Sequence, residues 1–425
     1  MTDPTAGPSA AALAAALATS LTADLDARLA AADAARAASY PGEREGRQPV
    51  HTVYVPADRF GVDTVPTWGR EALTTLDAHA DAFAALVADA DVVARVRDKL
   101  GREPVEDVRV DFEDGYVGRT DADEDADAVR AAVAMAQAQV RGCAAPFGGI
   151  RVKCLERPTR ERAVRTLTAH VGALVELGAS LENWVVTLPK VTSVDQVDAM
   201  VHACGRLEEA FGLRPGVLRF EVQVETPQSV LGPDGTALVA RMVHAAGPRL
   251  TGLHYGTYDY SASCGIAAGQ QSLEHPVADH AKLVMQAAAA GTGVRLSDGS
   301  TNILPVGGAD AVAHGWATHH RLVRRSLERG FPQGWDLHPA QLPTRYAATY
   351  SFYREGLAGA LARLADYRAR TMATIADEPA TARALATYLL RGLDCGAVEE
   401  REVEAGAGLG RADLRALAHH RPQEV

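Results

Sequence analysis

Short β-branched and apolar runs alternate with longer segments of helical periodicity from about residue 50 onward. Runs of this kind, bounded by polar and turn-forming residues, are typical of strands buried in a parallel sheet. Eight of them are present: Thr52–Val55, Val108–Phe112, Gly149–Cys154, Trp184–Leu188, Arg219–Val224, Leu250–Tyr255, Gly293–Leu296 and Gly334–Leu337. The gaps between them predict helices, for example over 123–140, 160–177, 194–211 and 309–329.

The polar residues at which these runs end recur at a nearly constant interval. They are 37, 39, 35, 34, 39 and 40 residues apart in the series Asp114, Arg151, Lys190, Glu225, Asp259, Asp298 and His338. One βα unit for each interval predicts an α/β fold, a (β/α)8 TIM barrel. The longer first interval, 58 residues from Pro56 to Asp114, predicts an extra helix around 72–100. The alternative, an open doubly wound sheet, normally has a Gly-rich phosphate turn after its first strand, and residues 55–59 contain no glycine.

Helical patterns flank the predicted barrel on both sides. Leucines four residues apart form a narrow apolar stripe on a helix that ends before Tyr40, and they are Leu13, Leu17, Leu21, Leu25 and Leu29. We expect this helix to dock on the main domain or on another subunit. Helical periodicity returns at 361–376 and 381–390, and Gly406, Gly408 and Gly410 follow no strand and are interpreted as a linker. The expected parts are an N-terminal helical extension (1–48), the (β/α)8 barrel (49–345) and a C-terminal helical extension (346–425).

The composition is that of a soluble globular protein, with 47% hydrophobic and 23% charged residues. The net charge of −11 argues against a non-specific nucleic-acid partner. No apolar run approaches the roughly 20 residues that cross a bilayer, so we expect no membrane partner. The apolar stretch 10–18 is interpreted as a helix and not a signal peptide, because the first basic residue is Arg28. Five cysteines without a C-x-x-C pair predict a reduced, cytoplasmic protein.

Two carboxylates stand at the ends of neighbouring predicted strands, Glu225 after the fifth and Asp259 after the sixth. Strand C-termini converge on one face of a barrel, so these side chains can share a hard divalent cation and leave positions for water and a chelating substrate. The alternative is that each carboxylate only caps the helix that follows it. Their occurrence together on adjacent strands favours the metal site.

Basic residues end the third and fourth strands. Arg151 needs a counter-charge because it lies inside a strand. Its guanidinium group can bind a substrate carboxylate or form a salt bridge to the acids of 111–114, and it can do both at once. Lys190 fits a Schiff-base amine or an ion-pair partner, and the acidic surroundings favour the ion pair.

Histidine motifs are weaker. His338, before Pro339, is expected at the active-site end of the barrel, whereas His254 is expected to be a buried, hydrogen-bonded residue. The histidine pairs at 275 and 280 and at 314 and 319 miss the i,i+4 spacing of zinc helices, and the chain has no G-x-S-x-G elbow and no P-loop.

Taken in order, the motifs resemble the HpcH/HpaI aldolase/citrate lyase family, which includes the citrate lyase β subunit and malyl-CoA lyase. This family belongs to the phosphoenolpyruvate/pyruvate-binding barrel superfamily. The resemblance covers about residues 50–345 and rests on Val53-Tyr54-Val55-Pro56-Ala57-Asp58, Asp111-Phe112-Glu113-Asp114, Arg151-Val152, Leu188-Pro189-Lys190-Val191, Val224-Glu225-Thr226, Gly256-Thr257-Tyr258-Asp259 and His338-Pro339-Ala340-Gln341.

The resemblance implies that Glu225 and Asp259 hold Mg2+ or Mn2+ and that Arg151 binds the carboxylate or carbonyl side of a 2-oxo acid. It implies a metal-dependent carbon–carbon lyase of the aldol or Claisen type, acting on a small oxo or hydroxy acid or its CoA thioester. A chelated divalent metal stabilises the enolate through which such reactions pass. Homo-oligomers are usual in this family, so we expect one here.

The remaining site residues are expected to support that chemistry. Glu113 and Asp114 would orient Arg151 or a metal-bound water, and Lys190 and Thr257 would contact the substrate. His338 and the carboxylate cluster are the candidates for the general base.

Two features depart from the family pattern. The chain has Lys153 where the family often has Asn after Arg-Val, so the substrate pocket is expected to differ. The segment 256–261, with two tyrosines, is more similar to malate synthase than to citrate lyase. Two alternative functions remain: a non-catalytic barrel or subunit that binds a small acid, and phosphoryl transfer on pyruvate or phosphoenolpyruvate, for which no phosphate-gripping motif is present.

Overall fold

Eight parallel strands form the centre of the molecule, as the sequence pattern predicts. The computed structural model describes residues 9–369 and 378–419. The strands are β1 (His51–Pro56), β2 (Asp107–Asp111), β3 (Phe147–Arg151), β4 (Trp184–Leu188), β5 (Arg219–Val224), β6 (Leu250–Tyr255), β7 (Arg295–Ser297) and β8 (Gly334–Asp336). They pair in the order β7-β6-β5-β4-β3-β2-β1-β8. A single bridge between Ser297 and Gln333 joins β7 to β8 and nearly closes the sheet into a (β/α)8 barrel.

Helices surround the barrel. Those that follow the strands are α5 (Asp121–Val140), α6 (Arg160–Glu176), α7 (Val194–Ala210), α8 (Pro227–Val230), α9 (Leu238–Ala246), α10 (Thr257–Ser263), α11 (Pro276–Ala289) and α12 (Ala309–Glu328). The extra helix expected around 72–100 is three helices: α2 (Thr64–Ala78), α3 (Ala80–Leu86) and α4 (Ala90–Arg102). Short 3-10 turns lie at Ala57–Arg59, Gly247–Arg249, Ala268–Gln270 and Pro339–Gln341. The fold class is therefore confirmed.

The barrel strands are apolar toward the helices and polar toward the barrel axis. In β2, Arg109 reaches across to Glu221 of β5, with its Nε and Nη2 atoms 3.1 and 2.9 Å from the two carboxylate oxygens. Nε2 of His254 lies 3.0 Å from Glu221, and its Nδ1 accepts from the indole of Trp335 at 3.2 Å. His254 is thus the buried, hydrogen-bonded residue that the sequence predicts. The alternation of charged and apolar residues in β2 and β5 follows from the period of two in a strand.

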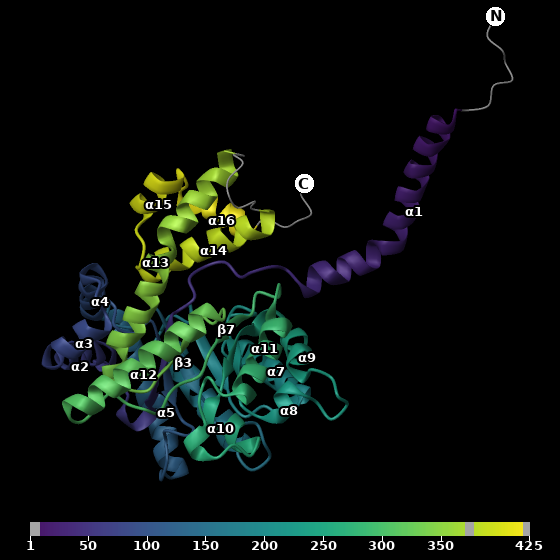
Figure 1. Cartoon of the computed structure of the whole chain (residues 1–425). Coiled ribbons are helices and arrows are strands. Elements are labelled where there is room, and N and C mark those ends of the chain that lie inside the picture. Colours follow the sequence, from purple (N-terminus) through teal and green to yellow (C-terminus); the bar gives the residue numbers. More distant parts are fainter. Residues whose placement is uncertain (1–8, 370–377, 420–425) are drawn as a thin grey trace, which may run out of the picture.

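Four helices of the C-terminal extension are described, and they pack beside the barrel: α13 (Leu342–Ala369), α14 (Pro379–Cys395), α15 (Glu400–Ala407) and α16 (Arg411–His419). In Figure 1, α14, α15 and α16 lie at one end of the molecule and α10, which follows β6, lies at the other. Because α10 starts where a strand ends, the extension lies near the N-terminal ends of the strands. Gly408 ends α15 in the left-handed conformation, at φ 61°, and the glycine triplet is a helix junction.

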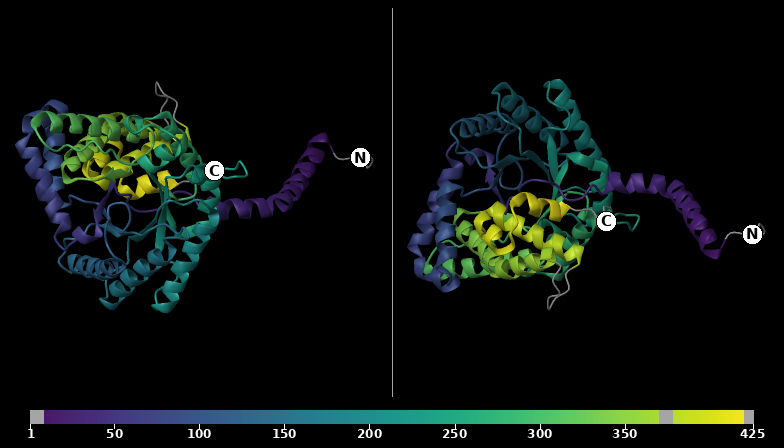
Figure 2. Two further views of the ribbon diagram at one scale, coloured as in Figure 1. Left: turned by 90° about the horizontal axis from the view of Figure 1, so that it is seen from below. Right: turned by 90° about the horizontal axis from the view of Figure 1, so that it is seen from above.

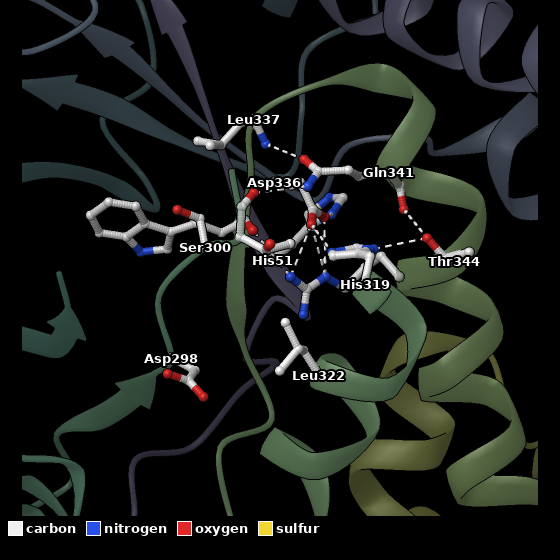
Figure 3. Close-up of polar contacts among 12 residues, drawn as sticks. His51, Asp298, Ser300, His319, Leu322, Asp336, Leu337, Gln341 and Thr344 are labelled. Atoms are coloured by element: carbon white, nitrogen blue, oxygen red, sulfur yellow. Dashed lines mark hydrogen bonds and ion pairs between the residues drawn. The ribbon is translucent and has the colours of Figure 1, made fainter. Parts of the chain in front are cut away.

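A buried carboxylate ties this extension to the barrel (Figure 3). Asp336 of β8 is fully buried and contacts Nδ1 of His51 at 2.7 Å and Nε2 of His319 at 3.0 Å. Arg345 of α13 donates to the same carboxylate at 2.9 Å. Nε2 of His51 accepts from the Glu106 amide at 3.0 Å, so its Nδ1 carries the proton that Asp336 accepts. One carboxylate thus joins β1, β8, α12 and α13.

The N-terminal helix α1 (Ala10–Ser39) extends away from the rest of the molecule (Figures 1 and 2). None of its residues is buried, and its five stripe leucines are 49–59% exposed. The prediction that this helix docks on the main domain is therefore wrong. No surface of the described chain receives its apolar stripe. Docking on another subunit stays a prediction.

Helix α1 is also long and apolar enough to cross a membrane, with a mean hydropathy of 1.2 in its most apolar window. It is the one described helix that meets this measure. The sequence expectation counted uninterrupted apolar runs, whereas an 18-residue stretch of this alanine-rich helix is apolar on average although polar residues interrupt it. A signal sequence meets the same measure, so length and composition assign α1 no membrane role.

Candidate active site

The C-terminal ends of five consecutive strands bring most of the predicted site residues together. These residues are Glu113 and Asp114 after β2, Arg151 at the end of β3, Lys190 after β4, Glu225 after β5 and Asp259 after β6. The ammonium group of Lys190 contacts three of the acids, lying beside Glu113, 2.9 Å from Asp114 and 3.1 Å from Asp259. The spacing of the motifs therefore predicts one cluster correctly.

Glu225 is the buried member of the cluster, with 2% of its surface exposed. Its Oε1 accepts the backbone N–H of Lys190 at 2.7 Å, and its Oε2 accepts from Nε2 of Gln223 at 2.7 Å. Burial raises the pKa of Glu225 to about 8, although Lys190 and Arg151 act against this rise. Burial thus disfavours the charged form of this carboxylate, and a further cation nearby would favour it.

Lys190 occupies the centre of the carboxylates. Its backbone φ of 50° is uncommon for a residue with a side chain and turns the chain sharply after β4. That turn aims the Lys190 amide at Glu225. Burial lowers the pKa of the Lys190 ammonium, but Glu225 and Glu113 outweigh this effect and raise it overall. Lys190 is therefore charged and paired, the ion-pair state that the sequence favours over a Schiff-base amine.

Arg151 is held by an acid of the neighbouring strand. Asp111 accepts from its Nε and Nη2 atoms, each at 2.7 Å, while its Nη1 atom lies 3.4 Å from Glu113 and 3.7 Å from Asp114. The guanidinium also lies 4.8 Å from the centre of the Tyr54 ring. Of the two expected roles, the salt bridge is present, and only the Nη1 edge of the fork stays available to a ligand.

Glu113 lies between the two cations. Burial raises its pKa to about 7, Arg151 opposes that rise, and Asp114 adds to it. Its Oε2 also accepts the backbone N–H of Asp114 at 2.9 Å. Glu113 is therefore a half-buried carboxylate that contacts Arg151 and Lys190 at once, in a position to hold both.

Two predicted residues are engaged elsewhere. The buried Thr257 hydroxyl donates to the Ser300 carbonyl at 3.2 Å, so it fastens the start of α10 to the loop after β7. Nδ1 of His338 accepts the Ala340 amide at 3.1 Å and caps the turn Pro339–Gln341. The structure joins neither residue to the carboxylate cluster by a hydrogen bond or ion pair. Their roles in substrate binding and catalysis stay predictions.

The sequence interpretation missed two residues that shape the site. Gln223 stands two positions before Glu225 on the same face of β5 and binds its carboxylate. Gly256 follows β6, and a Cβ atom there would lie 2.4 Å from Cβ and 2.6 Å from Oε2 of Glu225. The period of two in β5 is a signal that points to Gln223, whereas no sequence pattern indicates the close approach at Gly256.

The charges of the residues present favour a further cation. Four carboxylates, those of Glu113, Asp114, Glu225 and Asp259, face two cations, and Arg151 is already committed to Asp111. The described residues contain no group of three or more His, Cys, Asp and Glu side chains arranged to hold a metal. Instead, the Lys190 ammonium lies where the acids meet, and a positive ion is what their charge requires. Oxygen ligands of this kind suit Mg2+ or Mn2+.

Replacing Gly256 with Ala is expected to displace Glu225, because the added methyl group would overlap both Cβ and Oε2 of that residue. We expect a loss of stability of about 1–3 kcal/mol, the usual cost of overpacking, together with a loss of any metal-dependent Tm increase. Differential scanning fluorimetry with and without Mg2+ measures both.

Gly101→Ala is the matched control, since its Cβ would meet nothing within 4 Å and it lies in helix α4. This change should leave the Mg2+ response intact. Equal behaviour of the two variants would contradict the packing argument.

Comparison with known proteins agrees with this architecture. The model of a family described as a domain of unknown function, DUF6986, matches residues 29–422. No curated protein sequence matches the chain. The chain is similar to the solved structure of a citrate lyase from Burkholderia xenovorans LB400, with a TM-score of 0.56 and 19% identity over 86% of this chain and 97% of that one. It is also similar to a malate synthase of Haloferax volcanii in its lead(II) complex, with a TM-score of 0.52 and 15% identity over 88% and 99% of the two chains.

At these identities the two structures establish a shared fold. That fold is an α/β barrel with helical extensions, which agrees with the fold that the resemblance to the HpcH/HpaI family implies. The family whose model matches is, however, DUF6986.

Proposed function

This chain belongs to the DUF6986 family of domains of unknown function, and we propose that it is a metal-dependent carbon–carbon lyase of the aldol or Claisen type. Its substrate would be a small 2-oxo or hydroxy acid, or the CoA thioester of one. The observation that carries this proposal is the buried carboxyl group of Glu225 near Glu113 and Asp259, at the end of the barrel where the strands terminate. Catalytic groups of TIM-barrel enzymes lie at that end.

Glu225 and Asp259 would hold Mg2+ or Mn2+. The bound ion would supply the positive charge that an enolate oxygen needs. Glu225 is fixed for this role by the amides of Lys190 and Gln223, and it needs no further ordering when a ligand arrives. Asp259 is 44% exposed in its side chain and faces Lys190, so it can exchange partners.

Arg151 would bind the substrate carboxylate through its Nη1 atom, which the substrate would share with Glu113 and Asp114. Asp111 holds the guanidinium by two hydrogen bonds and the Tyr54 ring lies against it, so its orientation is set before the substrate binds. Pre-ordering of this kind lowers the entropic cost of binding. Glu113 contacts both Arg151 and Lys190 and would hold the two cations in place by offsetting their repulsion.

Lys190 would move when the metal binds, because its ammonium group and the ion would both be attracted to the carboxylates of Asp259 and Glu225. A released Lys190 would be a second cation for the substrate, beside Arg151. This is the substrate-binding role expected from the sequence.

Cellular location and assembly are also proposals. All five cysteines are free, which fits a reducing compartment such as the cytoplasm. The unpaired leucine stripe of α1 fits a homo-oligomer in which the stripe contacts another subunit.

A steady-state assay tests the function. Purified protein is freed of metal with a chelator and then supplied with Mg2+ or Mn2+, and panels of 2-oxo acids, hydroxy acids and acyl-CoA esters are offered in both reaction directions. We expect carbon–carbon bond formation or cleavage that requires the ion. Tight binding of an acid without turnover would favour the alternative, a non-catalytic barrel that binds a small acid. Metal-dependent exchange of phosphate would favour phosphoryl transfer.

A further inference from the structure

We propose that the N-terminal end of the barrel, opposite the candidate active site, binds a small, multiply charged oxyanion. A cavity of about 400 Å3 opens there. Its wall includes the first residues of several strands, among them Asp107 of β2, Phe147 of β3, Arg219 of β5 and Arg295 of β7. We call it the floor cavity.

Five arginines line the floor cavity: Arg44, Arg47, Arg109, Arg219 and Arg295. Two of them have carboxylate partners. Arg47 pairs with Glu103 and Glu106, and Arg109 pairs with Asp107 and Glu221. These two side chains are therefore neutralised within the protein.

The other three arginines have no carboxylate partner among the described residues. Arg44 donates to the Leu250 carbonyl at 2.9 Å, and Arg295 donates to the Gly46 carbonyl at 2.9 Å. Arg219 makes no side-chain hydrogen bond or ion pair within the described part of the chain. Glu45 and Glu182 also line the cavity, but both are exposed and neither pairs with these arginines. We call Arg44, Arg219 and Arg295 the floor arginines.

The floor arginines repel one another. Burial lowers the pKa of Arg295 to about 10, Arg44 and Arg219 lower it further, and Asp394 only partly opposes the shift. Burial and Arg219 also lower the pKa of Arg44. Three partly buried guanidinium groups without a carboxylate partner in hydrogen-bond or ion-pair contact would be stabilised by an anion that joins them.

The C-terminal extension adds to this positive charge. A smaller cavity beside the first is lined by Arg44 and Arg295 and also by Arg391, Asp394 and Arg415 of the extension. Asp394 is already paired with Arg411 of α16. The extension thus brings arginines to the barrel floor and closes one side of it.

The chemistry of the cavity selects the ligand class. Guanidinium forks bind planar carboxylates and phosphoryl groups through paired hydrogen bonds. A volume of about 400 Å3 lies in the range of small-molecule sites. The whole chain has a net charge of −11, which argues against a broad positive surface that binds polyanions. The positive charge at the floor cavity is therefore local. Phosphate esters and polycarboxylates share this oxyanion chemistry, and the experiment separates them.

Isothermal titration calorimetry of the full-length chain with pyrophosphate and, separately, with citrate tests the proposal. Divalent metal is omitted so that chelation and the opposite site do not contribute. We expect wild-type protein to bind at least one anion, and Arg219→Gln to bind it at least about tenfold more weakly, a loss of about 1.4 kcal/mol. The exposed Arg214→Gln is the matched control, and Glu225→Gln reports on the opposite site. Both should bind as wild type does.

A second measurement separates a ligand site from a structural role. Without anion, Arg219→Gln should melt no lower than wild type, because it removes repulsion and breaks no hydrogen bond. With the anion, only the proteins that keep Arg219 should gain Tm. Failure of wild type to bind either anion, or full binding by Arg219→Gln, would overturn the proposal, and neither result bears on the lyase activity.

Discussion

Glu225→Gln and Asp259→Asn are each expected to abolish metal-dependent turnover, with kcat/KM lowered by at least about 100-fold, the scale on which loss of one charge-stabilising group acts. Glu225→Ala and Asp259→Ala should do the same. Each change removes a carboxylate that would bind the metal and stabilise the charge of an enolate. The fold should persist, because neither residue belongs to the apolar core between strands and helices.

Glu225→Gln is a more specific test than Glu225→Ala. Glu225 accepts two hydrogen bonds, and Ala would leave the partly buried Lys190 amide without this partner. Glutamine can still accept from that amide. Its new NH2 group would face Gln223, whose Oε1 is buried and has no partner, so a turn of the Gln223 amide supplies an acceptor. The variant therefore keeps the local structure and loses only the charge.

Stopped or continuous assays of kcat/KM, together with Mg2+ titration by calorimetry, measure the two consequences. The exposed Glu161→Gln on α6 is the matched control and should behave as wild type. Unchanged rates in both the Glu225 and the Asp259 variants would reject the site. Loss of turnover with intact Mg2+ binding would place the metal elsewhere.

Asp336→Asn is expected to cause the largest loss of stability, about 3–5 kcal/mol, the usual result of removing one partner from a buried ion pair. The change leaves the Arg345 guanidinium, 4% exposed, without its counter-charge. It also weakens the contacts that Asp336 makes with His51 of β1 and with His319 of α12. Urea denaturation followed by circular dichroism measures the loss.

The pH dependence of this loss has a definite sign. Burial acts to raise the pKa of Asp336, but Arg345 and the two histidines outweigh it and hold the pKa well below its usual range. The stability contributed by the carboxylate is therefore complete above the pKa of an unfolded aspartate, about 3.9, and is lost as the pH falls below it.

The gap between wild type and Asp336→Asn should accordingly be constant near neutral pH and shrink in acid. The exposed Asp198→Asn on α7 is the control and should change stability by less than about 0.5 kcal/mol, as surface substitutions do. A variant as stable as wild type at pH 7 would contradict the role of Asp336.

The order of elements could be read from the sequence because it depends on local patterns. The β-branched runs of β4, β5 and β6 coincide with the observed strands, and the constant spacing of the residues after them requires one helix for each strand. A parallel barrel then places all strand C-termini on one face, whatever the details of packing. For that reason the meeting of Arg151, Lys190, Glu225 and Asp259 could be predicted as well.

Contacts that depend on the three-dimensional arrangement could not be predicted in this way. The position of Lys190 among the acids follows from its positive φ, which the residue type does not indicate. The hydrogen bonds of Thr257 and His338 depend on how the loops after the strands are arranged in space. The leucine stripe of α1 predicts an apolar contact, but only the fold shows that the described chain offers it no surface.

The sequence by itself determined the barrel, the order of its strands and the end at which its polar residues collect, because periodicity and spacing act along the chain. The tertiary structure decided which charges have partners. It paired Arg151 with Asp111, surrounded Lys190 with carboxylates, and left Arg44, Arg219 and Arg295 together on the floor of the barrel without a carboxylate partner among the described residues. Pairing depends on distances between residues far apart in the chain, and the electrostatic energy depends on those distances and on burial.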